Sequence, residues 1–98
     1  MGPEAKIEAA LIKAVIKAGG LTRKLNGTGY RHFPDRLVVL PGITAFIEVK
    51  ARGKRPTSAQ RHLHALLRLL DAHVYVLSNT DDIPDLMQQL GVGRGERK

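Results

Sequence analysis

The chain lacks cysteine and tryptophan, and it contains only two Phe and two Tyr among its 98 residues. Without cysteine there is neither a disulfide framework nor a Cys-based zinc site. No apolar run approaches the length needed to cross a bilayer. Glu4, Lys6 and Glu8 interrupt the N-terminal segment, where a signal peptide needs apolar residues. We therefore expect a soluble cytoplasmic protein without a membrane partner.

Length and hydropathy indicate one small domain. Hydrophobic residues make up 43% of the sequence, which is enough for a folded core and argues against a disordered chain. We assign residues 1–92 to the domain and residues 93–98 to a flexible basic tail. Because a domain of this length buries a modest share of its surface, self-association is expected.

Acidic residues are also scarce. Nine Asp and Glu stand against sixteen Lys and Arg, which gives a net charge of +7 and favours a polyanionic partner. The imbalance is greatest between Ala51 and Leu70, where no acid occurs. Such a segment is either a solvated basic face or a phosphate-binding surface.

The hydrophobic pattern predicts alternating helices and strands. Helices are expected over residues 3–18, from 57 or 58 to about 71, and from 79 or 80 to about 90. Strands are expected over residues 21–25, 36–40, 46–51 and 74–77. The apolar stripe of the second helix comprises Ala59, Leu63, Leu66, Leu67 and Leu70. This order favours an α/β fold, a mixed sheet flanked by helices, with the second helix crossing over into a parallel strand.

The strongest chemical signal is Pro34-Asp35 followed by Glu48-Val49-Lys50. Side chains alternate along a strand, so Glu48 and Lys50 share one face. With a hairpin turn centred near Gly42, Arg36 falls opposite Glu48, and Asp35 falls opposite Val49, next to the Glu48 row. Two carboxylates this close repel each other, and a bound divalent cation removes that repulsion.

Oxygen ligands suit Mg²⁺ or Mn²⁺. We predict that Asp35 and Glu48 bind this cation, with the carbonyl of Val49 as a further ligand. Lys50 would hold the attacking water or contact the scissile phosphate. The alternative is an exposed Glu-Lys pair on an edge strand, which contributes little. The Pro-Asp turn before the strand and the basic segment after it favour the metal site.

Two further residues are candidates. Glu8 lies along the apolar face of the first helix, where a carboxylate needs a partner, such as a metal or Lys50, unless it reaches solvent. Glu4, one turn earlier, is the fallback. Gln60 completes a capping box with Thr57, and it can also contact phosphate or a metal-bound water. The four histidines show no convincing zinc-ligand spacing.

These motifs together resemble a known family. Gly19-Gly20, Pro34-Asp35-Arg36, Ile47-Glu48-Val49-Lys50 and Ser58-Ala59-Gln60 resemble the VRR-NUC (virus-type replication-repair nuclease) branch of the PD-(D/E)xK superfamily, from about Glu4 to Leu90. The resemblance implies a restriction-endonuclease-like αβββαβ core and Mg²⁺- or Mn²⁺-dependent phosphodiester hydrolysis. It implies a catalytic set of Glu8, Asp35, Glu48, Lys50 and Gln60. The predicted metal ligands are therefore Asp35, Glu48, the Val49 carbonyl proposed above, and Glu8.

The resemblance also implies a phage or bacterial homodimer that acts on branched DNA, including Holliday junctions. We expect recognition of DNA shape and backbone rather than base sequence. The predicted DNA-contacting residues are Lys24, Arg31, Arg36, Arg52, Lys54, Arg55 and Arg61. One departure concerns the position two residues before Pro34, where the family often has Gly and this chain has His32. The turn leading to Asp35 is therefore expected to be shaped differently.

Two functions from different classes follow. The first is a metal-dependent, structure-selective DNA endonuclease. The alternative is a non-catalytic, basic nucleic-acid-binding module, which the charge distribution alone would explain and which binds in a salt-sensitive way without cutting.

Overall fold

The computed structural model describes residues 1–25 and 31–92. The sequence also predicts a flexible turn with two glycines at 26–29 and allows base stacking by Tyr30. Both of these, and the basic tail at 93–98, lie outside the described residues. The elements follow in the order α1 (Pro3–Lys17), β1 (Leu21–Lys24), β2 (Arg36–Leu40), β3 (Ile43–Val49), α2 (Ser58–Leu69), β4 (His73–Leu77), the 3-10 turn η1 (Thr80–Asp82) and α3 (Ile83–Gln89). This order agrees with the sequence prediction, except that the last helix divides into η1 and α3.

The two glycines that end α1 have different structural roles. Gly19 has φ of +83°, a left-handed conformation that glycine adopts without strain. Gly20 instead lies against β2, because a Cβ built there would be 2.5 Å from the carbonyl oxygen of Val39. The chain therefore turns sharply out of α1 and enters β1 in close contact with its neighbouring strand.

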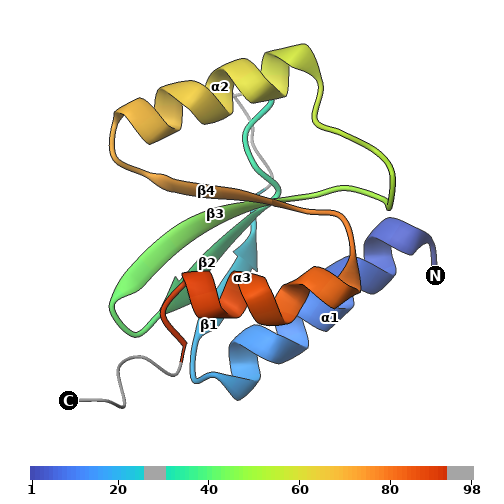
Figure 1. Cartoon of the computed structure of the whole chain (residues 1–98), viewed down its shortest axis with the longest axis vertical. Helices are drawn as coiled ribbons and strands as arrows, with labels where there is room; N and C mark the ends of the chain where they lie inside the picture. The colour runs from blue at the N-terminus through green and yellow to red at the C-terminus, as the bar shows by residue number, and fades with distance from the viewer. Residues whose placement is uncertain (26–30, 93–98) are drawn as a thin grey trace.

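The four strands form one mixed sheet in the order β1-β2-β3-β4. The pairs β1-β2 and β2-β3 are antiparallel, whereas β3 and β4 are parallel and are connected through α2. Helices α1 and α3 cover one face of the sheet and α2 covers the other (Figure 1). No helix within residues 1–25 and 31–92 is long and apolar enough to cross a bilayer.

The main hydrophobic core lies on the face covered by α1 and α3. Its buried members come from both helices and from the inward positions of β2, β3 and β4: Ile7, Leu11, Val15, Val38, Leu40, Ala45, Ile47, Val49, Leu77, Ile83, Leu86, Met87 and Leu90. No residue of α2 belongs to this cluster. The apolar stripe predicted on α2 is buried only in part, because Leu66 and Leu70 are exposed, while His64 is the buried residue of the helix.

The predicted hairpin register is wrong by one residue. Pro41 and Gly42 form a two-residue connection between Leu40 and Ile43, with Gly42 at φ of +86°, so the turn is centred between them and not on Gly42. Arg36 consequently pairs with Ile47 and not with Glu48. Because a shift of one residue moves a side chain to the opposite face, Arg36 lies on the α1 side of the sheet, away from Glu48.

Candidate active site

Glu48 lies near the end of β3, on the face of the sheet covered by α2. Its side chain is 1% exposed. One oxygen, Oε2, is 3.3 Å from the Lys50 Nζ and accepts a hydrogen bond of 3.2 Å from the Gln60 Nε2. The Lys50 side chain keeps partial access to solvent. The alternating pattern of β3 therefore places an acid and a lysine side by side at the end of a rigid strand.

Asp35 reaches the same place from the start of β2. Continuing the strand register by one residue sets Asp35 opposite Glu48. The backbone N–H of Val49 donates to the Asp35 Oδ2 at 2.8 Å, and the Asp35 carbonyl accepts from the N–H of Leu25. Asp35 is thus fixed by the backbones of two neighbouring segments. The carbonyl of Val49 remains a proposed metal ligand.

The turn before Asp35 contains the residue that departs from the family pattern. His32 has φ of +68°, in the left-handed region that favours glycine. This chain therefore forms a turn of the kind that glycine allows, although it carries a side chain at that position. The backbone strain lies three residues from a proposed metal ligand.

Electrostatics oppose the ionised form of Glu48. Burial, and after it the charge of nearby Asp35, raise the pKa of Glu48 to about 7, although Lys50 acts in the opposite direction. The Oε1 atom of Glu48 is buried without a hydrogen-bond partner. A divalent cation relieves each of these features, because it neutralises the carboxylate pair and uses oxygen atoms as ligands. The donors present therefore fit Mg²⁺ or Mn²⁺.

Gln60 combines the two roles that its position in the sequence allows. The N–H of Gln60 donates to the Thr57 Oγ1, and the Gln60 Oε1 accepts from the N–H of Thr57, which completes the capping box at the start of α2. The amide nitrogen of the same side chain donates to Glu48. The helix cap and the candidate site are therefore joined through one residue.

The structure adds His64 to the candidate site, although the spacing of the four histidines does not predict it as a ligand. His64 is buried, and its Nε2 atom lies 3.9 Å from the Glu48 Oε1. Burial lowers the pKa of His64, and the positive charges of Arg68 and Lys50 lower it further, so that the imidazole is held neutral. A signal for this residue exists in the sequence: His64 follows Gln60 by four positions and therefore lies on the same helix face.

The structure does not bring Glu8 to this site. Arg36 Nη1 donates to the Glu8 Oε2 at 2.7 Å, and the Lys24 Nζ lies 4.0 Å from the same oxygen. The partner that the structure shows for Glu8 is therefore Arg36, and the role of Glu8 as a metal-site acid stays a prediction. Among the described residues, no group of three His, Cys, Asp or Glu side chains is arranged to hold a metal ion. The fallback residue, Glu4, is exposed on the first turn of α1.

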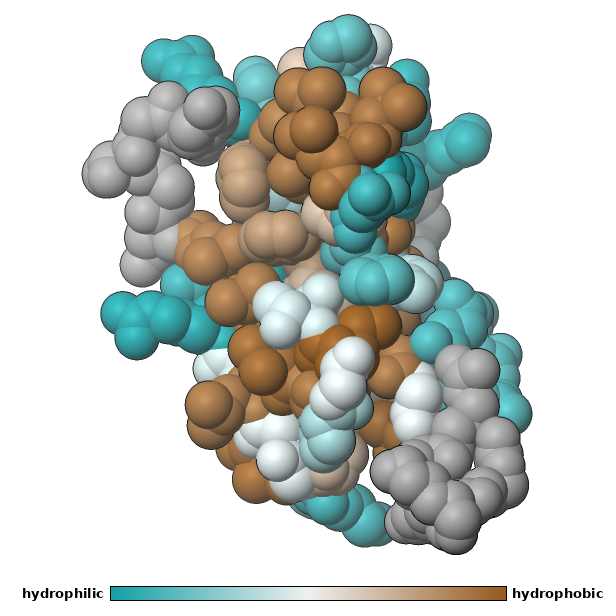
Figure 2. Space-filling view, turned by 90° about the vertical axis from the view of Figure 1, so that its left-hand side faces the viewer, coloured by the Kyte–Doolittle hydropathy of each residue, from teal (hydrophilic) through white to brown (hydrophobic). Residues whose placement is uncertain are grey.

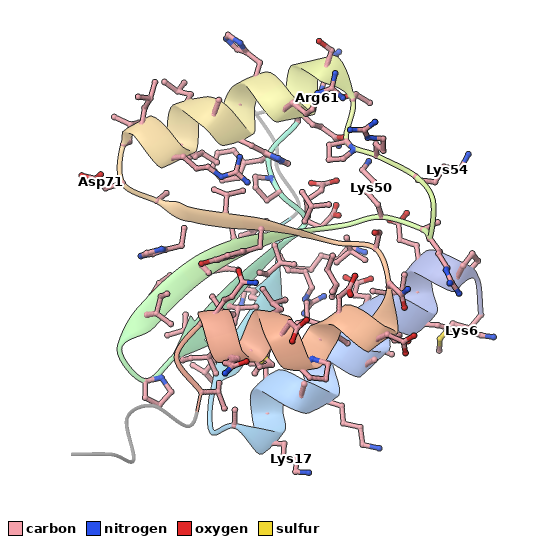
Figure 3. The ribbon with its side chains drawn as sticks, viewed as in Figure 1. Lys6, Lys17, Lys50, Lys54, Arg61 and Asp71 are labelled. Carbon is pink, nitrogen blue, oxygen red and sulfur yellow. The ribbon has the colours of Figure 1, made fainter. Side chains whose placement is uncertain are left out.

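The predicted DNA contacts divide into two groups. Arg36 is buried and bonded to Glu8 and Thr22, which argues against the predicted contact with DNA. The other six are exposed: Lys24, Arg31, Arg52, Lys54, Arg55 and Arg61. Arg61 donates to the carbonyl of Pro56 at 2.6 Å, which fixes the basic loop to α2. In Figure 3, Lys50, Lys54 and Arg61 lie on the side of the molecule where β3 leads through the loop into α2.

Comparison with known proteins agrees with this geometry. No family model matches the sequence. A protein named "Putative nuclease p44" from Acyrthosiphon pisum secondary endosymbiont phage 1 is 44% identical over 79 residues, which are 80% of this chain and 85% of the phage protein. A solved structure described as a VRR_NUC domain is 30% identical, with a TM-score of 0.84 over 90% of this chain and 97% of that chain.

The sheet order, with the carboxylate pair and the lysine where β2 and β3 meet, defines the restriction-endonuclease-like class of α/β proteins. Within this class, the chain belongs to the VRR-NUC family of nucleases.

Proposed function

We propose that this protein is a Mg²⁺- or Mn²⁺-dependent endonuclease that hydrolyses phosphodiester bonds in branched DNA. The observation that carries the proposal is the buried Glu48 carboxylate, which lies beside Asp35 and 3.3 Å from the Lys50 ammonium. A surface ion pair has no reason to be buried next to a second carboxylate, because both charges lose solvation. A metal-binding site accounts for that arrangement, because the cation compensates the two carboxylates.

Each residue has a separate task in this proposal. Asp35 and Glu48, with the Val49 carbonyl, would hold the cation, which supplies Lewis-acid chemistry and a water of lowered pKa. Lys50 orients the attacking water or stabilises charge on the scissile phosphate. Gln60 orients Glu48 through the bond to Oε2. Glu8 remains a candidate catalytic acid in this scheme. Its partner Arg36 directly follows Asp35 in the chain, so Glu8 is linked to the metal-binding strand through that ion pair.

The exposed basic residues around the site support DNA as the substrate. Arg52, Lys54 and Arg55 occupy the loop between β3 and α2, directly after Lys50. Side chains of this kind can bind phosphates whatever the base sequence. Recognition through the backbone is consistent with a preference for the shape of branched DNA, including Holliday junctions. The phage source of the similar protein favours the cytoplasm of a bacterial cell or a phage-infected host.

An exposed hydrophobic patch supports a homodimer. Leu66, Leu69 and Leu70 are 47%, 80% and 71% exposed at the C-terminal end of α2. Figure 2 shows the corresponding hydrophobic area at the top of the face that it presents. Two copies that cover this patch would place two active sites in one assembly, as symmetric cutting of a branched substrate requires.

A gel assay tests the proposal. Fluorescent four-way junction and matched linear duplex are incubated with Mg²⁺, Mn²⁺ or EDTA and with wild type, Lys50→Ala or the control Lys17→Ala. Lys17 is exposed near the end of α1, far from Lys50 (Figure 3). We expect metal-dependent cutting of the junction by wild type and Lys17→Ala, and a loss of at least about 100-fold in Lys50→Ala.

The outcomes separate the two functions considered. A shifted DNA band without cutting in either metal would favour the non-catalytic binding module. Equal cutting of junction and duplex would retain the nuclease and refute the preference for branched DNA. Undiminished cutting in EDTA would refute the metal requirement.

A further inference from the structure

Helix α2 buries a polar residue where an apolar one would pack without cost. His64 is the buried residue of the helix, and its side chain is 2% exposed. Leu63, which precedes His64, and Leu67, three positions after it, are half-buried, and Leu66 is exposed. If α2 were attached to the sheet by packing alone, a leucine at this position would be preferred over an imidazole. The presence of histidine therefore points to a polar task.

The task concerns the carboxylate of Glu48. Gln60 and His64 are four residues apart, so both project from the same face of α2. Gln60 contacts Oε2 at 3.2 Å, while His64 Nε2 faces Oε1 at 3.9 Å. One helix face thus presents a separate nitrogen to each oxygen of a single buried carboxylate.

The contact between His64 and Glu48 is longer than a hydrogen bond. Glu48 Oε1 and His64 Nε2 are both buried without a hydrogen-bond partner among the described residues. The separation of 3.9 Å exceeds a hydrogen bond by roughly 1 Å. Buried polar atoms are nearly always paired in native proteins, so two unpaired atoms that face each other indicate a state in which they meet.

We propose that His64 is a positioning residue for the metal-bound site, in which its Nε2–H donates to Glu48 Oε1 while Gln60 donates to Oε2. The inference rests on the proposed metal-dependent nuclease. Each carboxylate oxygen has two lone pairs. Oε2 already faces Gln60 and Lys50, so Oε1 is the oxygen that can accept from His64 and keep a second lone pair for a cation. Helix α2 would then fix the orientation of the ligand, as outer-shell residues do in other metal sites.

The matched variants His64→Gln and His64→Met test this role. Gln and Met have nearly the same length and both favour helices, but only Gln retains an N–H donor. His62→Met is the control, because His62 is exposed on the same helix. Binding of Mn²⁺ alone is measured by electron paramagnetic resonance, together with kcat and KM on junction DNA and thermal unfolding in EDTA.

We expect His64→Met to weaken Mn²⁺ binding by about tenfold and to lower kcat more than it raises KM. His64→Gln should recover most of both losses, and His62→Met should match wild type. In EDTA, His64→Met should be at least as stable as wild type, because an unpaired polar group is removed. A merely structural histidine would instead show equal losses in both variants, or lost stability without a change in Mn²⁺ affinity.

A measurement on the wild type covers the case in which His64→Met does not fold. The ¹⁵N resonances of the imidazole are recorded with and without Mg²⁺, which is diamagnetic. A downfield change at Nε2 of His64 on adding Mg²⁺ supports the new hydrogen bond, and an unchanged signal in a metal-saturated protein refutes it. Equal Mn²⁺ affinity in wild type and His64→Met would refute the role of His64 alone. Wild type that neither binds Mn²⁺ nor cuts DNA would refute the nuclease as well.

Discussion

Glu48 is held in surroundings that oppose its own negative charge. The side chain is buried, a second carboxylate is close, and the Lys50 ammonium compensates only in part. Without a bound metal, the folded protein therefore favours the protonated form of Glu48. Cation binding reverses this preference, because ligands must be deprotonated, and so metal affinity is expected to increase as the pH rises through about 7.

Removing this carboxylate should stabilise the metal-free protein in a pH-dependent way. The pKa of Glu48 rises from 4.5 to about 7 on folding, so its favourable contribution is complete below pH 4.5 and is lost as the pH rises through 7. In EDTA at pH 8, we expect Glu48→Gln to be more stable than wild type by about 3 kcal/mol, with little difference at pH 4. Urea unfolding at both pH values measures this. Equal stabilisation at the two pH values would contradict the assignment.

The ion pair between Glu8 and Arg36 is the second residue-scale feature. Arg36 is buried, and its guanidinium donates to Glu8 Oε2 and to Thr22 Oγ1. Loss of one member leaves the other charge buried without compensation. We expect Glu8→Gln to destabilise the protein by about 2 kcal/mol, whereas the exposed Glu4→Gln should have an effect below about 0.5 kcal/mol.

The same two variants decide whether Glu8 also serves the metal site. Chemical unfolding gives the stability, and Mn²⁺ titration gives the affinity. A loss of stability with unchanged Mn²⁺ affinity supports the structural pair. A loss of Mn²⁺ affinity in Glu8→Gln without a loss of stability would restore Glu8 as a functional acid of the site.

At the scale of elements, α2 differs from the other helices in how it is attached. Its start is fixed by the capping box of Thr57 and Gln60, and its end by Arg68, which donates to the carbonyl of Val74 at 2.8 Å. Its side chains contribute nothing to the main hydrophobic core. Polar contacts therefore fix both ends of the helix, alongside the half-buried Leu63 and Leu67, and two of its polar side chains face Glu48.

Variants at the helix start should separate the cap from the site. Thr57→Ala removes the cap and should cost about 1 kcal/mol, whereas Ser58→Ala should have little effect on stability. Gln60→Glu preserves the capping box but replaces the donor to Glu48 with a like charge. We expect Gln60→Glu to fold and to lose junction cutting. Thermal unfolding and the gel assay measure these effects, and full activity of Gln60→Glu would exclude a role for the Gln60–Glu48 contact.

At the scale of the whole molecule, two surfaces have different chemistry. The loop before α2 is basic, and the far end of the same helix carries exposed leucines. A patch of this kind on a small domain favours association, while the basic loop remains available to DNA. One helix would therefore connect the proposed dimer surface to the proposed active site.

A single charge in the leucine patch should separate the subunits. Light scattering of wild type should give twice the chain mass of 10.7 kDa, and Leu69→Glu should give the mass of one chain. Ile16→Glu is the control, because Ile16 is 63% exposed on α1, away from the patch. A monomeric wild type at working concentration would contradict the dimer, and a dimeric Leu69→Glu would place its interface elsewhere.

The sequence by itself determined the order of the elements and the residues of the central motif. These features depend on local chemistry: alternation along β3, the Pro-Gly turn, and the capping box before α2. Because Glu48 and Lys50 are two residues apart in a strand, their proximity required no knowledge of distant contacts.

Tertiary structure alone decided the register and the partners of the charged residues. A one-residue shift in the pairing of the hairpin strands placed Arg36 on the α1 face, where it pairs with Glu8 instead of approaching Glu48. The burial of His64 and the exposure of Leu66 and Leu70 likewise depend on how α2 lies against the sheet. Periodicity shows which residues share a helix face, but only packing against another element decides which part of that face is buried.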